Sequence, residues 1–399
     1  MMRRRAVRLL LFVLLLPLAP GVLAQDVRVW SLLTSPGQLE WLHSEIRAFE
    51  SATGAHVELE PLSPGELRGR LDAADPEDGS ASPVAVIVGL RHTEIGELAT
   101  SGALVPLEAY ATGNYLGDLL PAARTAFETA NSIWGLPLWI EGPALIYNRA
   151  LLPEIPDSYA AFQRELAAIS QGGTVGLAFD TSNLYYSYTW LRSFGGYLFG
   201  READGRVRPH EIGISTHGAA LGARELQLLR HTYGQLPDAT SEEVARLFSG
   251  GEVAVIYDGP WAVPRFHNAG IDVGVAPLPE RAGNRWVSFM ASAGVGVSAG
   301  EGDTTAAVNM AKWFATAESQ ARLARFEYLL PASREAVRRL GDQRLAAFAR
   351  ALEEAEPLPP ESAMAGVWAP MSAALSEILA HEAAPAQEIL ELARLKILD

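Results

Sequence analysis

One acidic residue, Glu141, follows directly on an apolar run from Leu136 to Ile140. A carboxylate buried there without a hydrogen-bond partner would be costly. A position at the edge of a cleft removes that cost, because a carboxylate can accept hydrogen bonds from two hydroxyl groups of a ligand. The alternative is that Glu141 is the structural partner of an arginine. The residue is therefore a candidate for binding a polyhydroxylated ligand.

Aromatic side chains are the second requirement of such a site, because a sugar presents a flat C–H face with hydroxyl groups at its rim. Two adjacent tyrosines, Tyr185 and Tyr186, lie in a polar segment that runs from Asp180 to Thr189. Tyrosine offers both a stacking face and a hydroxyl group, so the pair suits a saccharide. The alternative is that both rings only pack within a strand or a loop.

Two tryptophans are further candidates for stacking. Trp261 directly follows Gly259-Pro260 after an apolar run, and a Gly-Pro break there would place the indole at a rim. Trp368 precedes Ala369-Pro370 in a stretch rich in methionine and alanine. For each of them the alternative is a place in the core or between helices, because tryptophan is highly buried on average.

The segments around these residues alternate between predicted strands and helices. Apolar residues recur at helical spacing from Leu39 to Phe49, with Gly54 as the expected C-terminal cap. Short apolar runs predict strands at 27–30, 56–62, 84–88, 176–179, 253–257 and 273–277. Further helices are predicted at 93–100, at 219–230 and over most of the chain after 305. This alternation predicts an α/β fold with a mostly parallel sheet and helices on its faces.

The stretch from Gly135 to Asn148, GLPLWIEGPALIYN, resembles the lobe-crossing segment of the maltose/maltodextrin-binding protein family. That family is the sugar-specific group among the extracellular solute-binding proteins of ABC importers. Supporting matches follow in family order along nearly the whole chain: 49–54, 101–102, 195–197, 248–254, 258–261, 293–294 and 368–371. Each match is weak by itself, whereas the ordered set is specific.

The resemblance implies a periplasmic-binding-protein-like α/β fold, with two α/β lobes around a ligand cleft and a helical C-terminal region. The N-lobe would comprise residues 25–139 and 290–330, and the C-lobe residues 141–287 and 335–399. The lobes would close by a hinge on a maltose-, maltodextrin- or trehalose-type oligosaccharide. The closed protein, expected to be a monomer, would then dock on the transmembrane subunits of an ABC permease.

The resemblance also implies which residues bind the substrate. On the C-lobe side, and at its boundary, they are Glu141, Tyr185, Tyr186, Trp261 and Trp368. On the N-lobe side the matching segment, 90–94, is expected to contribute Thr93 and Glu94. Family members use an aromatic residue, an aspartate and an arginine there, and the loop 32–38 lacks the family's Asp-Lys pair. These departures leave the identity of the sugar open.

The first 24 residues have the pattern of a cleaved signal peptide. Arg3, Arg4, Arg5 and Arg8 precede a short apolar run at 9–16, and small or aliphatic residues precede the expected cleavage before Gln25. The run is well short of the roughly 20 residues that a membrane-spanning helix needs. The chain has no cysteine, so a lipid-carrying cysteine and disulfides are both excluded. We therefore expect a soluble periplasmic protein that is not a lipoprotein.

Length and charge narrow the function further. About 375 residues remain after cleavage, which is enough for two domains. The net charge of −15 becomes −19 once the four leader arginines are removed, which leaves 28 basic against 47 acidic residues. Such a surface repels phosphate backbones and anionic lipids, so we expect no nucleic-acid partner.

Two other functions stay open at this point. Ferric-iron-binding members of the solute-binding proteins also use adjacent tyrosines, so Tyr185 and Tyr186 do not exclude a non-sugar ligand such as iron. A secreted glycoside-processing enzyme is not excluded by counting carboxylates. However, the sequence has no His-Glu-x-x-His zinc motif, and its histidines are scattered. We therefore expect a binding protein with no catalytic residue, no metal site and no cofactor.

Overall fold

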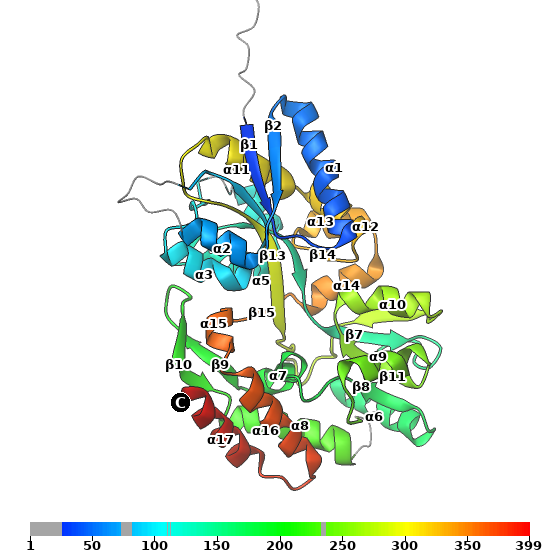
Figure 1. Cartoon of the computed structure of the whole chain (residues 1–399). Helices are drawn as coiled ribbons and strands as arrows, with labels where there is room; N and C mark the ends of the chain where they lie inside the picture. Colours follow the sequence, from blue (N-terminus) through cyan, green and yellow to red (C-terminus); the bar gives the residue numbers. More distant parts are fainter. Residues whose placement is uncertain (1–25, 73–81, 110, 112, 233–236) are drawn as a thin grey trace, which may run out of the picture.

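The computed structural model describes residues 26–72, 82–109, 111, 113–232 and 237–399. The predicted signal peptide, 1–24, and Gln25 lie outside the described residues. Figure 1 shows two α/β lobes, one above the other, joined by segments that pass between them. We call the lobe that holds the first described strand the N-lobe, and the lobe that holds the C-terminus the C-lobe. In the described part of the chain, no helix has both the length and the apolar composition needed to cross a membrane.

The N-lobe is built on a mixed sheet with the order β14-β6-β13-β3-β1-β2, in which β15 also pairs with β13. The strands are β1 (Asp26–Ser31), β2 (His56–Pro61), β3 (Val86–Arg91), β6 (Leu136–Glu141), β13 (Phe289–Val297), β14 (Leu330–Pro331) and β15 (Glu356–Pro357). β1 is parallel to β2 and β3, but β13 is antiparallel to β3 and β6. The prediction of a mostly parallel sheet was therefore wrong. β13 enters this sheet directly from the other lobe, so no strand–helix–strand crossover sets its direction.

Helices cover both faces of this sheet, because successive strand residues point to opposite sides. Val27 and Val29 pack in the core with α1 (Pro36–Thr53), α11 (Thr304–Phe314) and α12 (Ala317–Phe326). Trp30 packs on the other side with α2 (Pro64–Asp72), α3 (His92–Thr100) and α5 (Pro121–Ala126). A short hairpin of β4 (Glu128–Thr129) and β5 (Ser132–Ile133) completes the lobe.

Local signals set the ends of α1. The Ser35 hydroxyl oxygen accepts a hydrogen bond from the backbone N–H of Gln38 at 3.2 Å, which satisfies one of the free donors at a helix start. Gly54 ends the helix with a φ of 74°, in the left-handed region that favours glycine. The predicted helix and its glycine cap are confirmed.

The C-lobe is built on a four-stranded mixed sheet with the order β12-β7-β11-β8. The strands are β7 (Ala144–Asn148), β8 (Val175–Ala178), β11 (Val253–Asp258) and β12 (Val273–Ala276), and β9 (Tyr197–Arg201) forms a separate hairpin with β10 (Val207–Gly213). The helices are α6 (Tyr159–Gln171), α7 (Leu184–Ser193), α8 (His217–Gln227), α9 (Ser241–Ser249), α10 (Val263–Asn268), α15 (Glu361–Met364), α16 (Trp368–Ala380) and α17 (Ala386–Leu398), with a π-helical turn at Leu228–Thr232 and a 3₁₀ turn at Pro260–Ala262. The helical C-terminal region expected from the sequence is confirmed.

Three connections join the lobes. β6 leads into β7 through residues 142–143, β12 leads into β13 through 277–288, and α13 (Arg334–Leu340) and α14 (Gln343–Ala351) lead through β15 to α15. Because three connections join the lobes in the described chain, a hinge motion about these connections is physically accessible.

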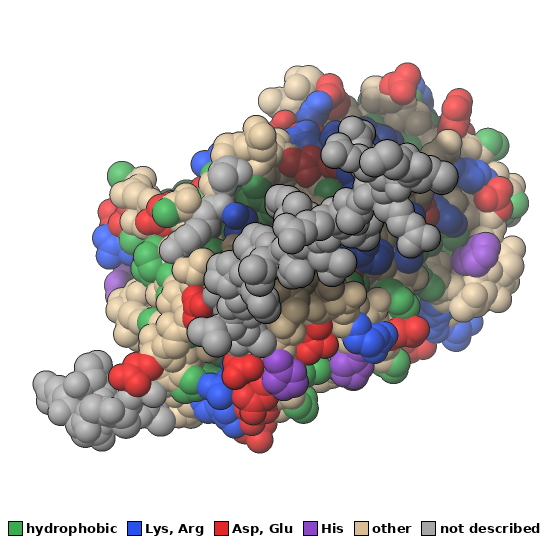
Figure 2. Space-filling view, turned by 90° about the horizontal axis from the view of Figure 1, so that it is seen from above, with side chains coloured by type: hydrophobic (Ala, Val, Ile, Leu, Met, Phe, Trp, Pro, Cys, Tyr) green, Lys and Arg blue, Asp and Glu red, His purple; other side chains and the backbone are tan. Residues whose placement is uncertain are grey.

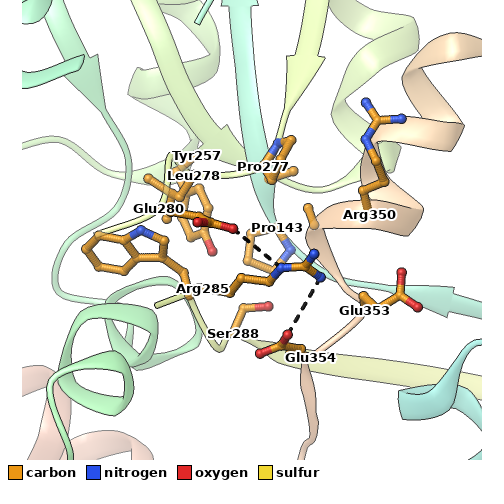
Figure 3. A pocket seen from close by; sticks show the side chains of 13 residues that line it. Pro143, Tyr257, Pro277, Leu278, Glu280, Arg285, Ser288, Arg350, Glu353 and Glu354 are labelled. Carbon is orange, nitrogen blue, oxygen red and sulfur yellow. Dashed lines mark ion pairs between the residues drawn. The ribbon is translucent and has the colours of Figure 1, made fainter. Parts of the chain in front are cut away.

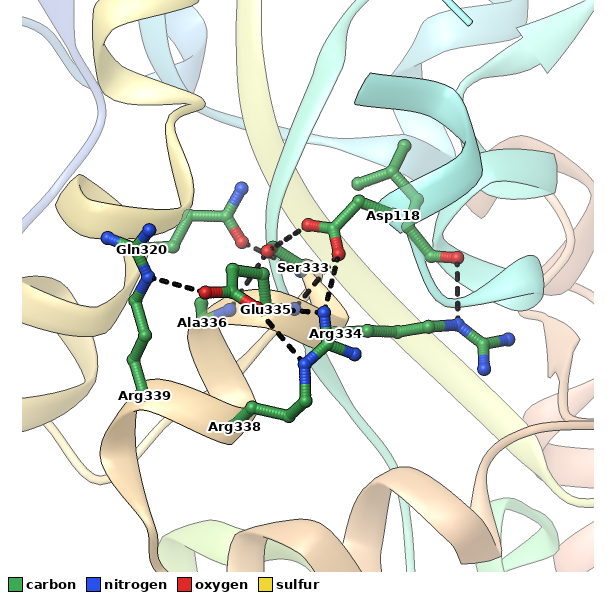
Figure 4. A network of polar contacts seen from close by, with 9 residues as sticks. Asp118, Gln320, Ser333, Arg334, Glu335, Ala336, Arg338 and Arg339 are labelled. Atoms are coloured by element: carbon green, nitrogen blue, oxygen red, sulfur yellow. Dashed lines mark hydrogen bonds and ion pairs between the residues drawn. The ribbon is translucent and has the colours of Figure 1, made fainter. Parts of the chain in front are cut away.

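The start of α13 is fixed by a polar network that belongs to the N-lobe (Figure 4). Asp118, which ends α4 (Gly113–Asp118), accepts hydrogen bonds from the Ser333 hydroxyl and, at 3.0 Å, from the backbone N–H of Glu335. The Gln320 side chain of α12 accepts a hydrogen bond from the Ser333 backbone N–H at 2.9 Å. The lobe boundaries given above stay a prediction. These contacts favour beginning the second C-lobe segment after α13 rather than at residue 335.

The charged side chains of the N-lobe lie in pairs rather than in patches of one sign. Arg28 contacts Glu58 at 3.1 Å, and Arg124 contacts Glu128 at 2.6 Å. Seen from above, acidic and basic side chains are interspersed over the described surface (Figure 2).

Candidate functional site

Glu141 lies at the last residue of β6, where the first connection leaves the N-lobe. Its Oε1 accepts a hydrogen bond from the Trp139 indole N–H at 3.0 Å, so its described donor is an indole and not the arginine considered from the sequence. Glu141 and Trp139 line a pocket of about 260 Å³, together with Thr93 and Arg91 from the start of α3 and the end of β3. Glu141 as a whole is partly exposed.

Tyr185 and Tyr186 lie in the first turn of α7, and not in the strand or loop considered from the sequence. Asn183 begins the helix, because its side-chain oxygen accepts a hydrogen bond from the Tyr185 backbone N–H at 3.0 Å. The Tyr185 hydroxyl donates to the backbone oxygen of Glu141 at 3.4 Å. The first connection between the lobes and α7 therefore meet at this tyrosine.

Trp261 follows β11 in the 3₁₀ turn and is 42 % exposed. Its indole lies 6.4 Å from the Tyr185 ring, between centroids, with the two planes tilted by 46°. It also lies against the backbone of Gly259, where a Cβ atom would come within 2.1 Å of the ring. The exposure predicted from the Gly-Pro break is confirmed, and glycine at 259 is what allows the indole to lie there.

Asp258 is a further residue of the candidate site that sequence reasoning did not single out, although it begins the segment Asp258 to Trp261. Its Oδ1 accepts hydrogen bonds from the Tyr186 hydroxyl at 3.2 Å and from the Gly259 backbone N–H at 2.7 Å. Burial raises its pKa to about 6, and the hydrogen bonds only partly offset that effect. An acidic residue at the end of a buried strand, next to Gly-Pro-Trp, was the signal that could have identified it.

The remaining predicted residues are placed less closely together. Thr93 lies on the N-lobe wall of the pocket that Glu141 lines. Glu94, beside it, is partly buried, and burial raises its pKa, with a smaller contribution from Glu361 on α15. Trp368 begins α16 and is 37 % exposed. The contacts in the described structure do not join Glu94 or Trp368 to the other candidates, so their roles stay predictions.

A second pocket, of about 280 Å³, lies where all three connections meet (Figure 3). Arg285 lies there between Glu280 and Glu354, with N–O distances of 3.8 and 3.6 Å. Pro143 and Pro277 line the same pocket. Because Arg285 pairs with two of the pocket's carboxylates and the walls are the connections themselves, this pocket is a feature of the hinge and a weaker candidate for the ligand.

The chemistry of iron binding and of acyl transfer fits the described residues poorly. Burial raises the pKa of both Tyr185 and Tyr186, which opposes the phenolate that ferric iron requires. Among the described residues, no group of three or more histidine or carboxylate side chains is placed to hold a metal ion. Residues 296–300 match the Gly-x-Ser-x-Gly pattern, but Ser298 is buried and its hydroxyl oxygen accepts a hydrogen bond from the Ala85 backbone N–H at 2.8 Å, so it is not an exposed nucleophile.

Comparisons with known proteins agree with this geometry. The galactooligosaccharide-binding protein of Bacillus subtilis is 28 % identical over 78 % of this chain and 76 % of its own length. A maltooligosaccharide ABC transporter solute-binding lipoprotein of Streptococcus pneumoniae is 23 % identical over 87 % of this chain and 83 % of its own. The Thermus thermophilus maltotriose-binding protein, solved with maltotriose, matches with a TM-score of 0.69 and 28 % identity, over 93 % of this chain and 99 % of that one. The model of the bacterial extracellular solute-binding proteins matches residues 46–347, and the chain belongs to that family.

Proposed function

We propose that this protein binds a maltooligosaccharide in the cleft between its lobes and delivers it to the transmembrane subunits of an ABC importer. The observation that carries the proposal is the set of aromatic faces and acceptor oxygens at one place. Trp261 and Tyr185 offer the faces, 6.4 Å apart, and Glu141 offers a carboxylate beside them. This combination matches a sugar ring, whose C–H face stacks on an aromatic while its hydroxyl groups donate to carboxylates.

The relatives support the ligand class. The proteins from Streptococcus and Thermus are named for maltooligosaccharide and maltotriose, whereas the Bacillus relative is named for a galactooligosaccharide. Stacking on an indole tolerates either sugar, so the choice between glucosides and galactosides depends on the hydroxyl partners. The departure at Thr93 falls on the N-lobe wall of the pocket that Glu141 lines.

We further propose that the protein acts by binding alone. Asp258, the acid nearest to Tyr186, is held by the tyrosine hydroxyl and by Gly259, so its Oδ1 is already occupied by two donors from the protein. Incubation with maltotriose and with aryl glucosides should give no hydrolysis above a buffer control. Turnover would contradict this part of the proposal.

The family and the signal-peptide pattern of residues 1–24 support an extracellular site of action. The proteins of this family are extracellular, and we propose cleavage before Gln25 and release as a monomer. Without cysteine, no lipid can be attached at the cleavage point. The intact mass of the exported protein would test this, since it should equal that of residues 25–399 with no lipid added.

The proposed ligand class is tested by calorimetric titration with a panel of maltotriose, trehalose, a galactooligosaccharide and ferric citrate. We expect saturable binding of one maltotriose per chain and a weaker response to the galactooligosaccharide. Tighter binding of the galactooligosaccharide than of maltotriose would contradict the proposed maltooligosaccharide. A red absorption band on addition of iron would contradict a sugar as the ligand.

A further inference from the structure

Asp258 lies between Tyr186 and the turn that carries Trp261. Its Oδ1 accepts hydrogen bonds from the Tyr186 hydroxyl and from the Gly259 backbone N–H. The carboxylate is therefore bound both to a tyrosine of α7 and to the glycine that precedes the turn carrying Trp261.

The carboxylate of Asp258 has no cationic neighbour among the described residues that act on it. From α7 it faces Tyr186 and, behind it, Tyr185. Asp180, two residues after the end of β8, accepts hydrogen bonds from the hydroxyls of Ser182 and Ser241. The ionised form of Asp258 is therefore stabilised by its hydrogen-bond donors alone, and an ionised group in this position depends on keeping them.

Glu45, a buried acid of the N-lobe, differs from Asp258 because it has a cationic partner. Glu45 is fully buried, and Arg322 approaches both of its oxygens, at 2.6 and 2.9 Å. Its charge is paired with a guanidinium group of the N-lobe. Asp258, by comparison, is bound to Tyr186 and Gly259, which are parts of the candidate site.

The same carboxylate fixes where the indole lies. Gly259 separates Asp258 from Pro260, and its backbone N–H is bound to the carboxylate at 2.7 Å. The Trp261 ring lies against this glycine. A change at the carboxylate is therefore transmitted both through the turn that carries the indole and directly to the Tyr186 hydroxyl.

We propose that Asp258 is a positioning residue whose ionised form holds Tyr186 and Trp261 in the arrangement that receives a sugar ring, and whose protonation weakens binding. This inference rests on the proposed function, because it concerns the same site. Burial raises the pKa of Asp258 to about 6, so the group is ionised at pH 7.5 and mostly protonated at pH 5. If only the ionised form binds, the apparent Kd at pH 5 is about tenfold higher, in proportion to the smaller competent fraction.

Calorimetric titrations with maltotriose between pH 5 and pH 7.5 test this inference. The wild-type protein should lose about tenfold in affinity at pH 5. Asp258→Asn keeps the shape and an acceptor oxygen, so its affinity should change little over this range. Asp272→Asn, which alters an exposed aspartate paired with Arg149, should follow the wild type. Wild-type affinity that is constant or rises at pH 5, or an Asp258→Asn variant that still follows the wild type, would overturn the inference.

A ligand-free measurement separates this inference from the proposed function. The difference in tryptophan fluorescence between the wild-type protein and Trp261→Phe reports on the Trp261 indole. This difference should change with pH around 6, and the same difference measured in the Asp258→Asn background should not. If no sugar binds at any pH, the proposed function fails while this titration still decides the role of Asp258. A difference signal without a transition near pH 6 would overturn it.

Discussion

Replacing Trp261 with alanine tests the central stacking contact. The indole is 42 % exposed without ligand. A tryptophan side chain presents up to about 250 Å², so about 100 Å² remains for a sugar ring to cover. At about 25 cal/mol per Å² this area is worth about 2.5 kcal/mol, which corresponds to a loss of roughly 60-fold in affinity. The fold should be little affected, because much of the indole lies outside the core.

The measurement is a calorimetric titration with maltotriose at pH 7.5, with circular dichroism to show that the variant is folded. Phe326→Ala is the matched control, because Phe326 ends α12 on the N-lobe surface and is 38 % exposed. We expect that control to bind like the wild type. A Trp261→Ala protein that binds within twofold of the wild type would refute the placement of the sugar on this indole.

Two further changes follow from particular contacts. Arg322→Ala leaves the buried carboxylate of Glu45 without the guanidinium group that contacts both of its oxygens. The free energy of unfolding, measured by urea denaturation, should fall by about 3–5 kcal/mol. A loss below about 1 kcal/mol would contradict the argument. Gly259→Ala places a methyl group against the Trp261 ring and should lower maltotriose affinity at least several-fold in the calorimetric titration. Gly366→Ala, where the added group meets nothing within 4 Å, is its control, and equal losses in both variants would rule out the steric explanation.

The sequence predicts those parts of the fold that local signals determine. Apolar spacing and the glycine at position 54 were enough for α1, because a helix and its caps depend on residues within a few turns. The direction of β13 could not be predicted in this way. It is set by the passage of the chain from the C-lobe into the N-lobe sheet, and the residues of the strand itself do not indicate its direction.

The candidate site residues also differ in whether local sequence signals could indicate them. Glu141 and Trp261 were named as candidates because each stands out locally, as an acid after an apolar run and as an indole after a Gly-Pro break. Tyr185 and Tyr186 were identified as candidates, but their place at the start of a helix was missed. Asp258 was missed as a site residue because its partner, Tyr186, is 72 residues away, and only the fold brings the two together. The family resemblance is confirmed by the family match.

A crystal structure of the protein with maltotriose tests the account most directly. The account predicts one sugar ring stacked on Trp261, with Tyr185 beside it and hydroxyl groups hydrogen-bonded to Glu141, and with the two lobes closed over the ligand. A maltotriose bound elsewhere, such as in the pocket around Arg285, with Trp261 left uncovered, would contradict it.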